Sequence, residues 1–175
     1  VLFSVISVIP DVSMCCTSDL KQPGDVLFIL GRTGKELGGS ELVSELGLEG
    51  GYVPQVDVLS ARSRYLALYA ALGHGLVSAC HDLSDGGLGV ALAEMCIGGN
   101  LGADLDVDQV PVCGLEGYAL DKIQAFEGLF AGQSLARVGQ VREEPIFSVH
   151  KSGARMFTDE VQELRRAWQG TFQGF

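Results

Sequence analysis

The stretch Cys80-His81-Asp82-Leu83-Ser84-Asp85-Gly86-Gly87-Leu88 joins two segments with different hydrophobic patterns. The run before it, Leu76–Cys80, is short and apolar, which predicts a buried strand. After it, apolar residues recur with the spacing i, i+3, i+4, i+7 that is typical of a helix; these residues are Leu88, Ala91, Leu92 and Met95. The sequence therefore predicts a strand, a tight polar turn and a helix in succession.

The predicted turn carries two carboxylates, a hydroxyl and two glycines, and its candidate site residues are Asp82, Ser84, Asp85, Gly86 and Gly87. Ser84 or Asp85 can cap the helix, because a side-chain oxygen there accepts a bond from a free N–H of the first turn. The two glycines have no Cβ, so another backbone or a phosphate can approach closely. Such a turn is a ready anion site, but it is also an ordinary way to begin a tightly packed helix, and both interpretations stay open.

A second glycine-rich turn follows the apolar run Val26–Leu30, which predicts a strand. Here the candidate residues are Gly38, Gly39 and Ser40, with Ser40 expected to cap a helix that begins at about Glu41. The order of strand, glycine turn and helix is the same as in the first stretch.

Two cations, Arg32 and Lys35, lie in this second turn. The spacing differs from the phosphate-binding loop G-x-x-x-x-G-K-[ST], because the lysine precedes the second pair of glycines. A phosphate contact and a solvated surface charge are both compatible with the pattern.

The remaining pattern predicts an α/β (α+β) protein with a mixed sheet covered by helices. Further strands are expected at Leu2–Ile9, Val12–Thr17, Leu101–Val107, Ser134–Val141 and Pro145–Val149, and further helices at Val58–Leu72, Asp121–Phe130 and Glu160–Trp168. In Val58–Leu72 the inward face is expected to hold Ala61, Tyr65, Leu68 and Leu72.

Composition limits the class of protein. The 175 residues suggest one domain, and a hydrophobic content of 47% indicates either a large core or an apolar surface that faces a partner domain. The net charge of −10 argues against a nucleic-acid surface. No apolar run reaches the ~20 residues that cross a bilayer, and Val1–Ile9 has neither the basic region nor the cleavage site of a signal peptide. We therefore expect a cytoplasmic protein and, because the chain does not begin with Met, a part of a longer one.

The cysteines and the aspartates give no metal site. The five cysteines show no metal-ligand spacing, and we expect reduced, mostly buried thiols. Cys80 and His81 are adjacent on a predicted strand and would point to opposite faces, which argues against a nucleophile–base pair. Asp104, Asp106 and Asp108 lack the glycine and the distal glutamate of a calcium loop, which favours a solvated strand face.

Three motifs in this order resemble the phosphoribosylformylglycinamidine synthases. They are Gly24-Asp25-Val26-Leu27, then Glu36-Leu37-Gly38-Gly39-Ser40-Glu41, then residues 80–88 with Ala91-Leu92-Ala93-Glu94-Met95. The resemblance is to the second of two C-terminal-type domains of the aminoimidazole ribonucleotide synthetase superfamily, and it covers residues 1–112 and 121–168. The Glu36–Glu41 stretch argues against aminoimidazole ribonucleotide synthetase and selenophosphate synthetase.

The resemblance implies a three-layer α/β/α domain over residues 1–168, with a tail at 169–175. It also implies an ATP-dependent amidotransferase of purine biosynthesis, in which the γ-phosphate activates the amide oxygen of formylglycinamide ribonucleotide and ammonia from glutamine displaces the phosphate. ATP or ADP and Mg²⁺ would be its cofactors, because this chemistry relies on positioning and Mg²⁺. Its partners would be the preceding synthetase domains of the same chain and a glutaminase domain or subunit.

In this half of the enzyme the resemblance assigns no catalytic residue. The two glycine turns would face a nucleotide or a domain interface, and the isolated domain would be inactive. The alternative is a non-catalytic structural nucleotide-binding domain or an interface scaffold. After Val110-Pro111 the chain departs from the family pattern, which favours a missing stretch near residues 113–121.

Overall fold

A computed structural model of the chain describes residues 4–34, 36–111 and 128–170. Its described strands form one mixed sheet in the order β1-β3-β2-β4-β5. The parallel pair is β2 with β4, and the other neighbouring pairs are antiparallel. The strands are β1 (Val26–Leu30), β2 (Gly102–Asp106), β3 (Leu135–Arg142), β4 (Ile146–Lys151) and β5 (Ala154–Glu160). The predicted mixed sheet and α+β class are confirmed.

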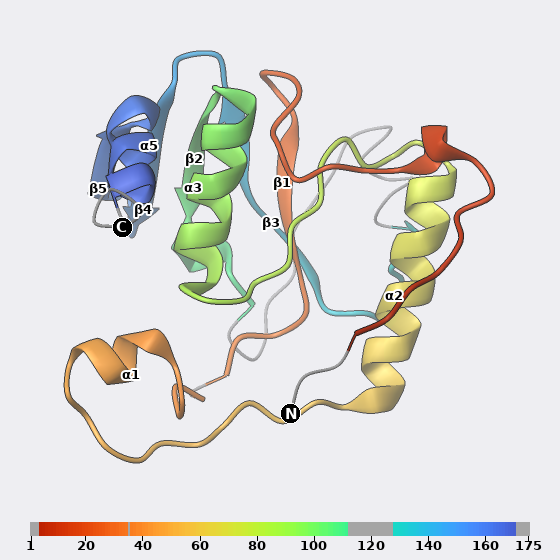
Figure 1. Cartoon of the computed structure of the whole chain (residues 1–175), viewed down its shortest axis with the longest axis horizontal. Coiled ribbons are helices and arrows are strands. Elements are labelled where there is room, and N and C mark those ends of the chain that lie inside the picture. Colours follow the sequence, from red (N-terminus) through yellow and green to blue (C-terminus); the bar gives the residue numbers. More distant parts are fainter. Residues whose placement is uncertain (1–3, 35, 112–127, 171–175) are drawn as a thin grey trace.

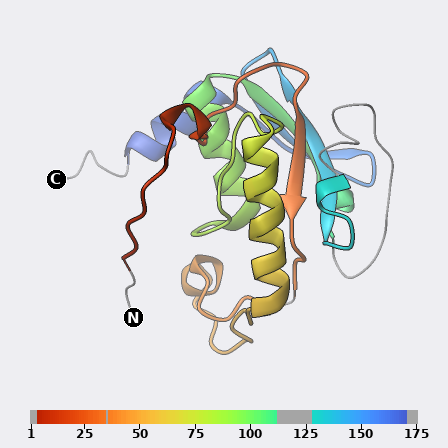
Figure 2. The same cartoon turned by 90° about the vertical axis from the view of Figure 1, so that its right-hand side faces the viewer.

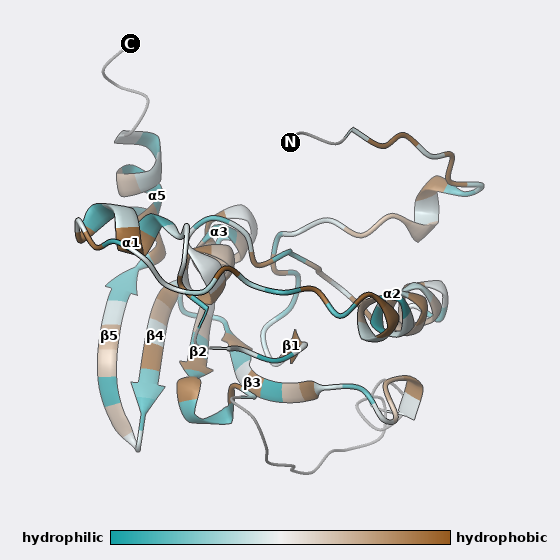
Figure 3. Ribbon diagram, turned by 90° about the horizontal axis from the view of Figure 1, so that it is seen from below, coloured by the Kyte–Doolittle hydropathy of each residue, from teal (hydrophilic) through white to brown (hydrophobic). Residues whose placement is uncertain are grey.

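The described helices are α1 (Glu41–Glu45), α2 (Val58–Gly73), α3 (Gly87–Gly99) and α5 (Val161–Gly170), with short 3₁₀ turns at Val12–Met14 and Val107–Gln109. In Figure 1, α3 stands before the sheet, α5 lies by β4 and β5, and α2 stands apart on the β1 side. Viewed from below, α3 and α5 lie on one side of the row of strands (Figure 3). The Arg165 guanidinium joins them by donating to the Ile97 carbonyl oxygen at 2.6 Å.

Two hydrophobic clusters hold these elements together. The larger unites α3 and α5 with the sheet, and its buried members include Leu92, Cys96, Ala103, Leu105, Val138, Phe147 and Val161. The smaller lies on the inward side of α2, and its buried members are Ala71, from α2 itself, and Phe130. The strand β1 serves both, because Leu27 and Ile29 belong to the first and Phe28 and Leu30 to the second. Successive side chains of a strand point to opposite faces, which explains this division.

The two predicted N-terminal strands are wrong. Residues 4–9 have no regular secondary structure, and Ile6 is 94% exposed. Val12–Met14 is a 3₁₀ turn in place of part of the second strand. The apolar pattern of residues 4–9 is real, but within the described residues no neighbouring strand offers the backbone partners that a ladder requires. Figure 2 shows this segment running away from the body of the molecule.

The strand predicted at Leu76–Cys80 is also wrong. The segment is half-buried but irregular, and its link to a neighbouring segment is a bond from the Cys80 N–H to the Thr17 carbonyl oxygen at 3.2 Å. In contrast, β5 was missed, because its alternation is obscured by charged residues at an exposed position of the sheet. The helix predicted at Asp121–Phe130 and the suspected missing stretch at 113–121 lie almost wholly outside the described residues.

Much apolar surface is exposed, as one of the two explanations of the hydrophobic content anticipated. Large exposed hydrophobic side chains come from the N-terminal segment, from α1 and the loop after it, and from α2. Among the described residues, no helix is long and apolar enough to cross a membrane. The hydrophobic excess of the sequence therefore lies partly on the surface.

Candidate functional site

The polar turn before α3 is closed by its backbone, and neither predicted cap is present. Gly86 occupies the N-cap position in the left-handed region, with φ of 81°, and makes no side-chain cap bond. The Gly87 N–H donates to the Ser84 carbonyl oxygen at 3.0 Å. A backbone turn of this kind satisfies one of the free N–H groups of the helix start without a side chain. The side chains of Ser84 and Asp85 are therefore left exposed to solvent.

The close approach expected at the two glycines occurs at Gly86, and its neighbour belongs to the same helix. A Cβ at Gly86 would collide with the Val90 side chain, whereas a Cβ at Gly87 would meet nothing within 4 Å. Gly86 is thus required both by its positive φ and by the packing of the first helical turn. The room beside Gly87 is open to another molecule or domain.

His81 anchors this turn to α3, a contact that the sequence analysis did not find. Its Nε2 lies 2.9 Å from Glu94 Oε2, and its Nδ1 lies 2.8 Å from the Asp82 carbonyl oxygen. The imidazole is 17% exposed, whereas the Asp82 side chain is 84% exposed. Both ring nitrogens are thus engaged in hydrogen bonds. His81 therefore positions the turn, and the Asp82 carboxylate, 3.4 Å from His81 Nδ1, stays largely exposed to solvent or a partner.

The second glycine turn matches its prediction at the cap. Ser40 Oγ accepts a bond from the Val43 N–H at 3.3 Å and begins α1. Gly38 is buried, its N–H donates to the Tyr52 carbonyl oxygen at 2.9 Å, and a Cβ there would lie 2.7 Å from the Gly51 carbonyl oxygen. The backbone that Gly38 admits is therefore that of the following loop. Gly39 is exposed, with φ of 77° and open space around it.

The two turns lie on the same side of the molecule. Figure 1 places α1 below the N-terminal end of α3, and Figure 2 agrees. Within the described ranges, no hydrogen bond or ion pair joins them. The structure thus brings the candidate residues to one end of the fold but does not fuse them into one cluster.

Of the two cations in the second turn, the structure describes Arg32 but not Lys35. Arg32 is exposed, and none of the ion pairs between described residues includes it. Lys35 lies outside the described residues. A solvated surface charge accounts for Arg32 without a ligand.

The described thiols are free, and they differ in exposure. Cys96 is buried, Cys16 and Cys80 are half-buried, and Cys15 is exposed, so the expectation of mostly buried thiols is wrong. Burial raises the pKa of the Cys96 thiol to about 12 and also raises the pKa of Cys80. Because the thiolate is the nucleophile, these raised pKa values disfavour reactivity at both positions. His81 contacts Glu94 and Asp82, as described above, which agrees with the argument against a Cys80–His81 pair.

The described part of the chain contains no group of three His, Cys, Asp or Glu side chains that could hold a metal ion. The aspartates of β2 and its continuation are engaged otherwise. Asp104 pairs with Arg142 at 2.9 Å, and Asp106 accepts a bond from the Asp108 N–H at 3.0 Å. Asp108 itself accepts from the Ser152 N–H. The calcium-like spacing therefore reflects pairing and capping.

Residues 22–127 match the family described as AIR synthase related protein, C-terminal domain. The chain belongs to this family of C-terminal domains. It is similar to the phosphoribosylformylglycinamidine synthase subunit PurL of Thermococcus sibiricus, with 35% identity over 155 residues that cover 78% of this chain and 21% of the relative. This agrees with the resemblance that the three motifs indicated.

Solved structures of relatives share the fold. The T. maritima PurL complexed with FGAR superposes with a TM-score of 0.73 at 25% identity, covering 87% of this chain and 30% of that chain. The T. maritima PurL complexed with ATP gives a TM-score of 0.67 at 22% identity, covering 87% and 27%. The chain thus spans about a fifth of the length of the curated relative and less than a third of the solved ones.

Proposed function

We propose that this chain is a C-terminal-type domain of a phosphoribosylformylglycinamidine synthase. The complete enzyme would convert formylglycinamide ribonucleotide, glutamine and ATP to formylglycinamidine ribonucleotide in purine biosynthesis, in the cytoplasm. The observation that carries the proposal is the similarity to PurL, which extends over most of this chain in both sequence and fold. The order of the three motifs supports it.

In this proposal the domain supplies a scaffold and two backbone turns, and other domains of the polypeptide complete the active site. Gly87 and Gly39, with open space beside them, and the exposed Asp82, Ser84 and Asp85 would line the interface with a neighbouring domain or with a nucleotide. The described residues contain no group of three His, Cys, Asp or Glu side chains that could hold Mg²⁺ by themselves. A Mg²⁺ bound with ATP would therefore need phosphate oxygens and ligands from other parts of the polypeptide to complete its coordination, and no step of the reaction is assigned to residues of this chain.

Turnover tests this proposal. The longer polypeptide that contains these residues, together with its glutaminase, should form formylglycinamidine ribonucleotide from formylglycinamide ribonucleotide, Mg-ATP and glutamine. The 175 residues alone, given ammonia in place of glutamine, should form none. Product formation by the 175 residues alone would refute their role as an incomplete part, and a longer polypeptide inactive with every substrate present would refute the assignment itself.

The second candidate function is an interface scaffold without a nucleotide. It is favoured by the glycine contacts, because Gly38 packs on the Gly51 backbone and Gly86 on the Val90 side chain, which explains both without a ligand. Calorimetric titration of the longer polypeptide with Mg-ADP, with and without the change Ser84→Asp, which adds a carboxylate at an exposed position of the turn, separates the two candidates. A nucleotide at this turn predicts that a binding event is lost in the variant, since a carboxylate would repel phosphate. Unchanged heats support the scaffold.

A further inference from the structure

Helix α2 is apolar on two sides, and only one of them is used within this chain. Its inward side packs on the smaller core cluster through Ala67, Leu68 and Ala71. Its outward side exposes a stripe of large side chains. The members of this outward stripe are Val58, Leu59, Tyr65, Leu66 and Tyr69, which are 57–78% exposed, and the exposed Arg62.

The spacing of the outward stripe is that of a helix-packing surface. Val58, Arg62, Tyr65 and Tyr69 are separated by four, three and four residues, which places them in one row along the helix. Tyr65 was expected on the inward face but is 70% exposed, so that expectation is wrong. A continuous row of large apolar side chains on a helix is normally covered by another element.

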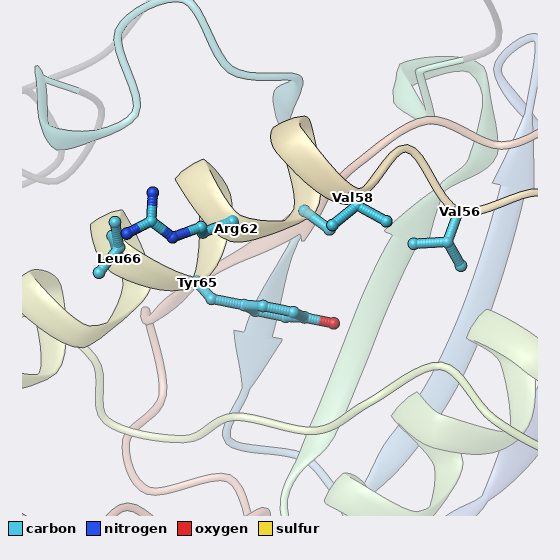
Figure 4. Close-up of a pocket in the computed structure, with 6 residues that line it drawn as sticks. Val56, Val58, Arg62, Tyr65 and Leu66 are labelled. Atoms are coloured by element: carbon cyan, nitrogen blue, oxygen red, sulfur yellow. The ribbon is translucent and has the colours of Figure 1, made fainter.

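The stripe contains a hollow of about 400 Å³ that can receive side chains from a partner. Ala61, which is 8% exposed, belongs to its lining, and the larger Val56, Val58, Tyr65 and Leu66 surround it. Figure 4 shows the Tyr65 ring extending along the helix on the side of Val58 and Val56, while the Arg62 side chain points the other way. Small residues between large ones form the holes into which a partner's side chains insert.

Arg62 is the charged member of the stripe, and it specifies the chemistry of the partner. Among the described residues, none of the ion pairs includes Arg62. Covering it with a purely apolar surface would bury a guanidinium without an acceptor, which is costly. A fitting partner therefore carries apolar side chains for the hollow and a carboxylate opposite Arg62.

We propose that the outward stripe of α2 docks against another domain of the same longer polypeptide, one that presents an apolar surface with a carboxylate facing Arg62. The inference rests on the proposed function, in which this chain is one part of a larger synthase. The Thermococcus sibiricus relative has about four-fifths of its chain outside the matched region, which is enough polypeptide to cover the stripe. A second copy fits less well, because two chains of net charge −10 repel each other and would bring the same unpaired arginines together.

Hydroxyl-radical footprinting of the longer polypeptide tests the docking directly. Tyr65, Leu66 and Tyr69 should be oxidised several-fold more slowly than Met156, allowing for intrinsic reactivity measured on the unfolded protein. Met156 is the reference because it has comparable exposure, 65%, and lies on β5, away from α2. Oxidation of the stripe at the rate expected from its exposure would overturn the proposal. Protection that appears only as protein concentration rises would overturn it in favour of a second copy.

Paired variants give a second readout. Tyr65→Asp with Leu66→Asp should lower the melting temperature of the longer polypeptide and restore oxidation at Tyr69, whereas Met156→Asp should do neither. Arg62→Glu should also lower the melting temperature and increase oxidation at Tyr69, because the new carboxylate would repel the partner's carboxylate. Stripe variants that behave like Met156→Asp would contradict the docking. Turnover of the unmodified polypeptide is measured separately: an active enzyme with an oxidised stripe rejects only this inference, and a protected stripe without activity rejects only the proposed function.

Discussion

The glycines in and next to α3 differ in whether the fold requires them. Gly86 is needed for a left-handed backbone at the start, and Gly98 admits the Cβ and Cα of Asp19 near the end. Gly89 does neither, since a Cβ there would meet nothing within 4 Å and its backbone is helical. Of these three glycines, the fold requires Gly86 and Gly98 but not Gly89.

This difference predicts opposite effects of the same substitution. Gly89→Ala should stabilise the chain by about 0.5–1 kcal/mol, because alanine loses less backbone entropy in a helix. Gly98→Ala should destabilise it by about 1–3 kcal/mol, because its Cβ would lie 2.8 Å from Asp19 Cβ and force a backbone shift. Urea unfolding followed by circular dichroism measures both midpoints. Shifts of the same sign in the two variants would contradict this account of α3.

At the scale of elements, the sequence predicts best where local signals agree. Val26–Leu30 forms β1, because a short apolar run lies between glycines and both of its faces find a core. Ser40 caps α1 as expected, because a cap is a contact between residues three apart. The helix after the polar turn was also found from periodicity, although Gly86, not Ser84 or Asp85, occupies its cap.

The wrongly predicted strands share one physical cause, which is that the described part of the fold places no strand beside them. Residues 4–9 and 76–80 have the composition of strands, but a strand exists only when a second strand accepts its backbone bonds. The segment at Cys80 has one such bond to Thr17, and the N-terminal segment stays exposed. The contact between His81 and Glu94, thirteen residues apart, could not be foreseen either. At the candidate site, the residue types were predicted from the sequence. The neighbours of each glycine were not, because the three-dimensional path of the backbone determines them.

For the whole molecule, two properties oppose each other in solution. Extensive apolar surface on the N-terminal segment and on α2 favours association, whereas a net charge of −10 at pH 7 keeps copies apart. In the longer polypeptide that we propose, neighbouring domains would cover this apolar surface. In the 175 residues alone, pH decides whether apolar attraction or charge repulsion between copies is stronger.

Self-association of the 175 residues should therefore be strongest near their isoelectric point of about 4.6 and weak at pH 8. Near pH 4.6 the carboxylates that supply the negative charge are partly protonated, the mutual repulsion falls, and the exposed apolar side chains can pack together. Static light scattering at the two pH values gives the average mass, and circular dichroism at both confirms that the comparison is between folded chains. The variant Tyr65→Asp with Leu66→Asp should reduce the mass at pH 4.6 more than Met156→Asp does, because it removes part of the outward stripe of α2. Equal masses at both pH values would show that charge is not what separates the copies, and equal effects of the two variants would show that association uses another surface.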